Sequence, residues 1–317
     1  MPLQIVFMGT AELASASLLA LTRQPGFAVV AVVTQPDRPG GRRLQLQPSP
    51  VKQTALAEKF SVLQPESARD EKFLGELRLL QPDVIVVAAY GQMLPPAILQ
   101  LPPHGCLNVH TSLLPKYRGA SPIQSAILND EAETGVTIMK IDAGLDTGDI
   151  LAQAATPIRA EDNSQTLHDR LARLGAELLV QTIPDYIAGR ISPRPQPATG
   201  VSHAAKIKKS DGQLDWRQPA RTLWNRIRAF TPWPGAFTWL PGPPDNKLLK
   251  ICQAEVVERS GAPGEILTAD KSGVVVACGQ HALRILELQL EGGRRLAVRD
   301  FLVGHSLPPG GKMGQTR

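Results

Sequence analysis

The sequence predicts an α/β protein with a doubly wound, mostly parallel sheet, followed by a smaller β-rich domain. Apolar runs that suit buried parallel strands alternate with helical periodicity over the first 188 residues. A proline-rich stretch at 190–200 then interrupts this pattern. After it, short β-branched runs alternate with Gly and Pro turns, as in a small OB-like β-barrel.

The first elements indicate a Rossmann-like sheet. Residues 3–8 suit a buried strand, Gly9 and Thr10 form a turn, and residues 11–22 have helical periodicity. The G-x-G-x-x-G spacing of a dinucleotide site is absent. We expect further strands at 27–33, 83–89, 107–110, 135–141 and 150–155, and helices at 51–60, 68–80, 121–129 and 162–188.

The chain has 317 residues, 43% of them hydrophobic, which is enough for two cores. We expect a first domain at 1–189, a linker at 190–206 and a second domain at 207–317. The three cysteines are far apart and odd in number, which suits a reducing compartment rather than disulfides. The spacing of Cys and His predicts no metal site, and no apolar run is long enough to span a membrane. We therefore expect a cytoplasmic protein. We also expect a monomer.

Charge is distributed unevenly between the two halves. Residues 1–202 carry 17 Lys and Arg against 19 Asp and Glu, whereas residues 203–317 carry 17 against 10. A basic second half suits a polyanionic partner such as nucleic acid, and simple solubility is the alternative explanation.

Two polar side chains mark the end of the expected strand at 107–110. Asn108 and His110 are two residues apart, so on a strand both point to one face while Val109 points to the other. An amide can polarise a carbonyl oxygen, and an imidazole can move a proton near neutral pH. The alternative is a polar strand end that its own loop caps.

An acidic loop follows the expected strand at 135–141. It runs from Asp142 to Asp149 and contains two glycines and three acids, with a spacing that does not suit calcium. It is either a solvated turn or the source of an Asp that lies beside His110 and supports acid–base chemistry.

Together these stretches resemble the folate-dependent formyltransferases. The residues that carry the resemblance are Asn108, His110, the run Ser112-Leu113-Leu114-Pro115, and Asp146 within Leu-Asp-Thr-Gly. The resemblance implies that Asn108, His110 and Asp146 are catalytic and pass a formyl group from 10-formyltetrahydrofolate to an amine. The longer string at 113–123, with 133–138 after it, is more narrowly similar to members that formylate methionyl initiator tRNA.

The resemblance also implies a binding site for the folate donor in the loops that follow three strands. The residues it assigns to this site are Tyr90, Gly91, Met93, Leu94, Ser112, Leu113, Leu114, Pro115, Asp142 and Gly144.

A long loop at 34–50 combines arginines with two glycines and four prolines. Its composition suits a basic finger that orders on a phosphate backbone, and it resembles the insertion of the tRNA-specific members. A solvated crossover loop is the alternative. The expected contacts with tRNA are Arg38, Arg42 and Arg43 in this loop and Lys206, Lys208 and Lys209 where the second domain begins.

Three functions therefore compete. The first is formylation of initiator tRNA, the second is formyl transfer to a small molecule or hydrolysis of a formyl-folate, and the third is RNA binding without catalysis. The loop at 34–50 and the basic second half favour the first over the second. The presence of Asn108, His110 and Asp146 argues against the third, since a binding protein does not need them.

Overall fold

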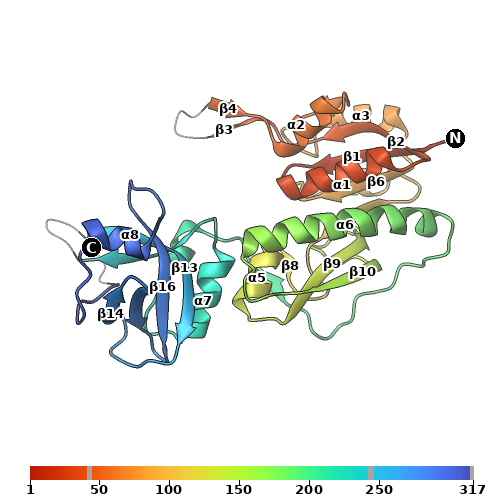
Figure 1. The fold of residues 1–317 in the computed structure, drawn as a ribbon. Coiled ribbons are helices and arrows are strands. Elements are labelled where there is room, and N and C mark those ends of the chain that lie inside the picture. The colour runs from red at the N-terminus through yellow and green to blue at the C-terminus, as the bar shows by residue number, and fades with distance from the viewer. Residues whose placement is uncertain (41–44, 242–245, 315–317) are drawn as a thin grey trace. The chain divides into compact units, whose positions relative to one another are not determined.

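The structure is a computed structural model that describes residues 1–40, 45–241 and 246–314 (Figure 1). By their internal contacts these residues form two compact units. The first unit holds residues 1–122, 133–157 and 168–204, and the second holds residues 123–132, 158–167 and the described part of 205–317. Each unit is described by itself below.

The first unit is built on a sheet of order β10-β9-β7-β6-β1-β2-β5. Five neighbouring strands of this sheet, β5, β2, β1, β6 and β7, run parallel to one another. This confirms the predicted Rossmann-like fold class. β9 is antiparallel to β7, and β10 is antiparallel to β9. The bounds are β1 Leu3–Gly9, β2 Phe27–Val33, β5 Val62–Leu63, β6 Val84–Ala88, β7 Cys106–His110, β9 Glu133–Lys140 and β10 Ile150–Pro157.

Helices alternate with the parallel strands along the chain, because the sequence alternates between the apolar runs of buried strands and the 3.6-residue periodicity of helices. β6 is buried along its whole length, as a central parallel strand requires. The side chain of Ser49 caps the start of α2 (Pro50–Ala57), and that of Asp70 caps α3 (Glu71–Leu80). The apolar side of α3 buries Phe73, Leu74 and Leu77 in the core beside β6. The other helices here are α1 (Glu12–Arg23) and α4 (Pro96–Leu99).

The long helix α6 (Ser164–Ile187) lies against β7 and β9. Gly175 lets it approach the sheet closely, because a Cβ at this position would lie 2.9 Å from a methyl carbon of Val109 and 3.3 Å from one of Val136. Val109 therefore faces α6, and Asn108 and His110 face the other side of β7. Across the described ranges, no helix combines the length and the apolar character needed to cross a membrane.

The second unit contains an antiparallel sheet of order β12-β13-β16-β15-β14, with β17 paired to β16. Its core includes Leu223 and Ile227 of α7 and Phe301 of α8, which pack with apolar residues of the sheet. Within the described residues β12 and β14 are not paired, so closure into an OB-like barrel stays a prediction. The bounds are α5 Pro122–Leu128, η1 Lys209–Gly212, α7 Ala220–Ala229, β12 Ala236–Leu240, β13 Lys247–Val257, β14 Ile266–Asp270, β15 Gly273–Ala277, β16 Ala282–Leu290, β17 Leu296–Ala297 and α8 Val298–Gly304.

Two segments have more structure than their composition indicates. The loop at 34–50 contains a short antiparallel pair, β3 (Arg38–Gly40) with β4 (Gln45–Gln47). The segment expected to be a linker at 190–206 belongs to the first unit as far as Ala204, and its strand β11 (His203–Ala204) pairs with β8 (Arg118–Gly119). Backbone hydrogen bonds of this kind depend on distant partners, so proline content alone did not predict them.

A pair of glycine substitutions tests the packing of the first unit. In Gly135→Ala the new methyl group would overlap the Ala154 carbonyl oxygen and the Leu113 side chain. We expect a loss of stability of about 1–3 kcal/mol. Gly75→Ala in α3 has nothing within 4 Å of its new methyl group and should instead stabilise the chain by about 0.5–1 kcal/mol. Urea denaturation of both variants measures the difference, and equal midpoints would contradict this description of β9 and β10.

Candidate active site

The candidate site begins at the carboxyl end of β7, in the first unit. β7 lies between β6 and β9, with Val87 opposite Asn108 on one side and Thr137 opposite His110 on the other. His110 is buried and Asn108 is half-buried. The alternation of a strand thus places an amide and an imidazole side by side on the face opposite α6.

His110 is held by the backbone of the loop that follows its strand. Its Nε2 atom lies 3.0 Å from the carbonyl oxygen of Tyr117. A carbonyl oxygen can only accept, so Nε2 carries the proton in this arrangement. Nδ1 faces the Asp146 carboxylate, with 3.7 Å between Nδ1 and Oδ2. This separation suits an ion pair when the ring is protonated, and it is too long for a direct hydrogen bond.

Asp146 reaches His110 because the loop after β9 turns back over the sheet. β9 is antiparallel to β7 and pairs Lys140 with Leu107, so it ends beside the start of β7. The loop must therefore return along β7. Gly148 permits this turn, since a Cβ there would overlap the Lys140 carbonyl oxygen. The Asp146 carboxylate then accepts a hydrogen bond of 2.8 Å from the Gly119 N–H.

The run Ser112-Leu113-Leu114-Pro115 is tied down by one buried hydroxyl. Thr137 Oγ1 donates to the Ser112 carbonyl (2.7 Å) and accepts from the Leu114 N–H (3.1 Å) and from Gln153 Nε2 (3.0 Å). Ser112 Oγ is itself bonded to the Lys116 carbonyl, and Leu114 packs in the core. Both side chains hold the loop in shape, and contact of this run with the folate donor stays a prediction.

The other two loops assigned to the folate donor also lie in the first unit. Tyr90 is buried in the core, its hydroxyl has no hydrogen-bond partner among the described residues, and burial raises its pKa to about 12. Its carbonyl oxygen accepts from Thr10 and Gln35, which shapes the turn through Gly91. Asp142 accepts from the Gly144 N–H. Met93 is 52% exposed, so it is available to a ligand, whereas the Tyr90 ring is not.

The residues expected to contact tRNA are exposed where they are described. The Arg38 side chain is 65% exposed and lies 3.8 Å from the Glu66 carboxylate. Arg42 and Arg43 lie outside the described residues. Lys206, Lys208 and Lys209 are exposed at the start of the second unit.

Sequence reasoning missed Gln196, Arg118 and Thr137. Gln196 Nε2 donates to the carbonyl oxygens of Asp146 and Gly148, both at 2.8 Å. Arg118 donates to the Oε1 atom of Gln196. No local pattern marks Gln196, which lies between two prolines in a segment that composition assigns to a linker. Thr137 could have been found, because it shares a β-strand face with a polar neighbour across the sheet.

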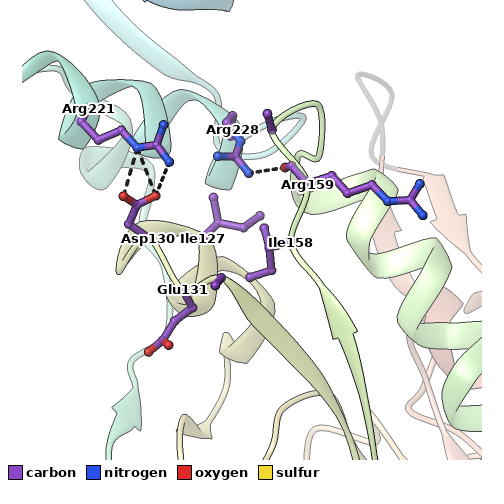
Figure 2. A pocket seen from close by; sticks show the side chains of 9 residues that line it. Ile127, Asp130, Glu131, Ile158, Arg159, Arg221 and Arg228 are labelled. Atoms are coloured by element: carbon purple, nitrogen blue, oxygen red, sulfur yellow. Dashed lines mark hydrogen bonds and ion pairs between the residues drawn. The ribbon is translucent and has the colours of Figure 1, made fainter.

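The second unit contains a pocket of about 220 Å³, which is a second candidate for a binding site (Figure 2). Arg221 grips the Asp130 carboxylate with Nε and Nη2, which holds the pKa of Asp130 below its usual value. Arg228 donates to the carbonyl oxygens of Arg159 and Asp162, and burial lowers its pKa. These two cations are already bonded to protein oxygens. We therefore interpret the contacts around the pocket as structural and do not assign an anion site to it.

Comparison with known proteins agrees with this geometry. The profile of the formyl transferase family matches residues 3–183, and that of the formyl transferase C-terminal domain matches residues 206–306. The chain is 50% identical over 313 residues to the methionyl-tRNA formyltransferase of Citrifermentans bemidjiense, covering 99% of this chain and 97% of that one. It is also 50% identical over 311 residues to the methionyl-tRNA formyltransferase of Caldanaerobacter subterraneus, covering 97% of this chain and 99% of that one.

One solved structure shows the same fold at low sequence identity. HypX from Aquifex aeolicus, crystallised with tetrahydrofolic acid, is 18% identical, with a TM-score of 0.62 over 95% of this chain. The chain spans about half of HypX, 47% of its length.

Replacement of Thr137 tests how the loop after β7 is held. Thr137→Val keeps the shape but leaves the Leu114 N–H without its oxygen partner in a buried place, so we expect a loss of about 1–3 kcal/mol. Thr137→Ser keeps the hydroxyl and should lose less. Urea denaturation and hydrogen exchange of the Leu114 amide measure both effects. Unchanged exchange in Thr137→Val would refute this role.

Proposed function

Because the chain belongs to the formyl transferase family, we propose that it transfers a formyl group from 10-formyltetrahydrofolate to the α-amino group of methionyl initiator tRNA. The observation that carries the proposal is that Asn108 and His110 share one face of β7 and that the Asp146 carboxylate lies 3.7 Å from His110 Nδ1. The two relatives at 50% identity, both methionyl-tRNA formyltransferases over nearly their whole length, support the choice of substrate.

In the proposed reaction Asn108 stabilises charge on oxygen. The amine of the methionyl ester attacks the carbon of the formyl group that the donor carries on N10. The bond between that carbon and N10 then breaks, and the proton lost by the amine is balanced by the proton that N10 gains as tetrahydrofolate leaves. The amide N–H of Asn108 donates to the formyl oxygen as negative charge develops there, an interaction that strengthens in the transition state. A half-buried position on β7 suits this role, because a strand holds the amide more firmly than a loop would.

His110 and Asp146 are proposed to remove the proton of the attacking amine. Nε2 of His110 is committed to the Tyr117 carbonyl, so Nδ1 is the nitrogen left to accept a proton. The resulting imidazolium would lie 3.7 Å from the Asp146 carboxylate, which stabilises the positive charge. Asp146 is thus proposed to act through charge, and the Gly119 N–H keeps its carboxylate in place.

Two apolar side chains support a folate donor. Met93 and Leu145 come from the loops after β6 and β9, and each is 52% exposed. Large exposed apolar side chains in loops that follow strands of the sheet suit a flat aromatic ligand. The complex of HypX with tetrahydrofolic acid shows that a protein of this fold accommodates a folate.

The basic charge of residues 203–317, with 17 Lys and Arg against 10 Asp and Glu, supports tRNA as the acceptor. We expect the protein to act in the cytoplasm, where charged initiator tRNA is used, and as a monomer.

The direct test supplies the protein with 10-formyltetrahydrofolate labelled in the formyl group. One reaction contains methionyl initiator tRNA, a second contains free amines, and a third contains water alone. Label on the methionine of the tRNA supports the proposal. Label on a free amine, or release of formate, would indicate the small-molecule transferase or the hydrolase instead. Binding of tRNA without any transfer would indicate an RNA-binding protein.

Substitution of the polar residues on β7 tests their roles. Asn108→Ala and His110→Ala should each lower kcat by about 100-fold or more, because they act on the transition state. Affinity for tRNA should change by less than about twofold. His168→Ala is a matched control, since this histidine also lies beside a carboxylate, that of Asp169, but on α6. Turnover near that of the unmodified protein in either β7 variant would remove that residue from catalysis.

Removal of positive charge tests the tRNA contacts. We expect the combined substitution of Lys206, Lys208 and Lys209 by Ala to weaken tRNA binding and to lower the salt slope of log K by up to about 3, one for each lost phosphate contact. Arg42→Leu should lower turnover on charged tRNA while donor affinity is unchanged. Lys72→Ala, an exposed lysine on α3, is the control. A triple variant with the original salt slope would exclude these lysines from the tRNA surface.

A further inference from the structure

We propose that Gln196 is a positioning residue for the formyl-transfer site, which it serves by fixing the backbone that carries Asp146. The inference rests on the proposed function, because it assigns a purpose to a contact of the Asp146 loop. It also makes the segment that precedes the second unit part of the catalytic machinery rather than a spacer.

The amide of Gln196 satisfies two carbonyl oxygens of one loop. Nε2 has two hydrogens, and it lies 2.8 Å from the oxygen of Asp146 and 2.8 Å from that of Gly148. Both donors of the amide are therefore used across the two ends of a three-residue stretch. A single side chain thus fixes the direction of two peptide groups beside the carboxylate.

The Asp146 loop needs such support because its backbone is strained. Asp146 has a φ of +52°, in the left-handed region that side chains other than Gly seldom adopt. A conformation of this kind costs about 1–3 kcal/mol and persists only where surrounding contacts hold it. Gly144 and Gly148 on either side offer little resistance to relaxation. Loss of the Gln196 amide would therefore let Asp146 move.

Gln196 is oriented in turn by a residue next to the catalytic pair. Arg118 directs both Nε (3.1 Å) and Nη2 (2.7 Å) at the Oε1 atom of Gln196. The neighbours of Arg118 make the other two contacts of the site, since the Tyr117 carbonyl binds His110 and the Gly119 N–H binds Asp146. Three consecutive residues thus hold the site: Tyr117 binds the imidazole of His110, Arg118 binds the amide of Gln196, and Gly119 binds the carboxylate of Asp146.

The segment that carries Gln196 is anchored on both sides. Before it, Arg194 exchanges two backbone hydrogen bonds with Ile150, of 2.8 and 2.9 Å. After it, Ser202 accepts from the Tyr117 N–H at 2.9 Å, and β11 pairs with β8. These anchors hold Gln196 against the loop. The segment is therefore already ordered, and the contacts of Gln196 carry little additional entropy cost.

Two variants separate the two ends of the amide. Gln196→Leu removes both its donors and its acceptor. Gln196→Glu keeps an oxygen for Arg118 but places a carboxylate against two carbonyl oxygens, to which it cannot donate. In both, we expect kcat for formyl transfer to fall by about 10–100-fold, since a displacement near 1 Å can cost this much. KM for donor and tRNA should stay within about twofold.

Gln289→Leu is the matched control. Gln289 is also half-buried and donates to a backbone carbonyl, that of Gly293 at 2.8 Å, but it lies in the second unit. It should retain full kcat. All three variants should unfold within about 3 °C of the unmodified protein, because both glutamines are half-buried and water can replace the hydrogen bonds that they lose. A kcat loss in Gln196→Leu that merely follows a large fall in melting temperature would overturn the proposal in favour of a structural role.

Hydrogen exchange gives a readout that does not depend on activity. The Gly119 N–H is bonded to the Asp146 carboxylate, so its exchange should become faster in both Gln196 variants and not in Gln289→Leu. Unchanged exchange together with unchanged kcat would refute the inference. If the unmodified protein transfers no formyl group, the proposed function fails. Faster exchange at Gly119 would then still show that Gln196 positions Asp146, and unchanged exchange would overturn that too.

Discussion

The hydrogen bond from the Gly119 N–H to the Asp146 carboxylate is the contact on which the site depends. Asp146 follows a strand that runs antiparallel to β7, so the strand by itself delivers the acidic loop to the edge where β7 starts. Only the return of the loop brings the carboxylate beside His110. The Gly119 N–H fixes the carboxylate at that place, and Gly148 lets the chain after Asp146 pass close to the Lys140 carbonyl oxygen.

The same principle governs the rest of the site, because hydrogen bonds from buried Thr137 and half-buried Gln196 also hold its loops. Thr137 serves the run after β7, and Gln196 serves the acidic loop. Each makes at least two hydrogen bonds, and at the buried Thr137 a donor or acceptor left without a partner costs about 1–3 kcal/mol. This penalty makes alternative loop conformations expensive, so the geometry is set before a substrate arrives.

The sequence predicted what depends on local pattern and missed what depends on distant partners. Apolar runs located β1, β2, β6 and β9 to within a few residues, and alternation along β7 predicted that Asn108 and His110 share a face. Nothing in a strand's composition states its direction, so the antiparallel course of β9 was not foreseen. The role of Gln196 was not predicted, because it depends on a contact with Asp146, fifty positions earlier in the chain. The prolines on either side of Gln196 indicate only an extended chain.

Net charge alone does not locate an RNA-binding surface on the second unit. Many arginines of the second unit are occupied by carboxylates within it: Arg217 by Asp215, Arg221 by Asp130, Arg284 by Glu255 and Arg295 by Glu287. Arg221 and Arg228 also stack on the Trp224 ring. These four ion-paired arginines keep 37–82% of their side-chain surface exposed, so each pair is weak, but a phosphate would still have to compete with the paired carboxylate. In the described residues no ion pair engages Lys206, Lys208 or Lys209, so their charge is available to a polyanion and the start of this unit is the better place for one.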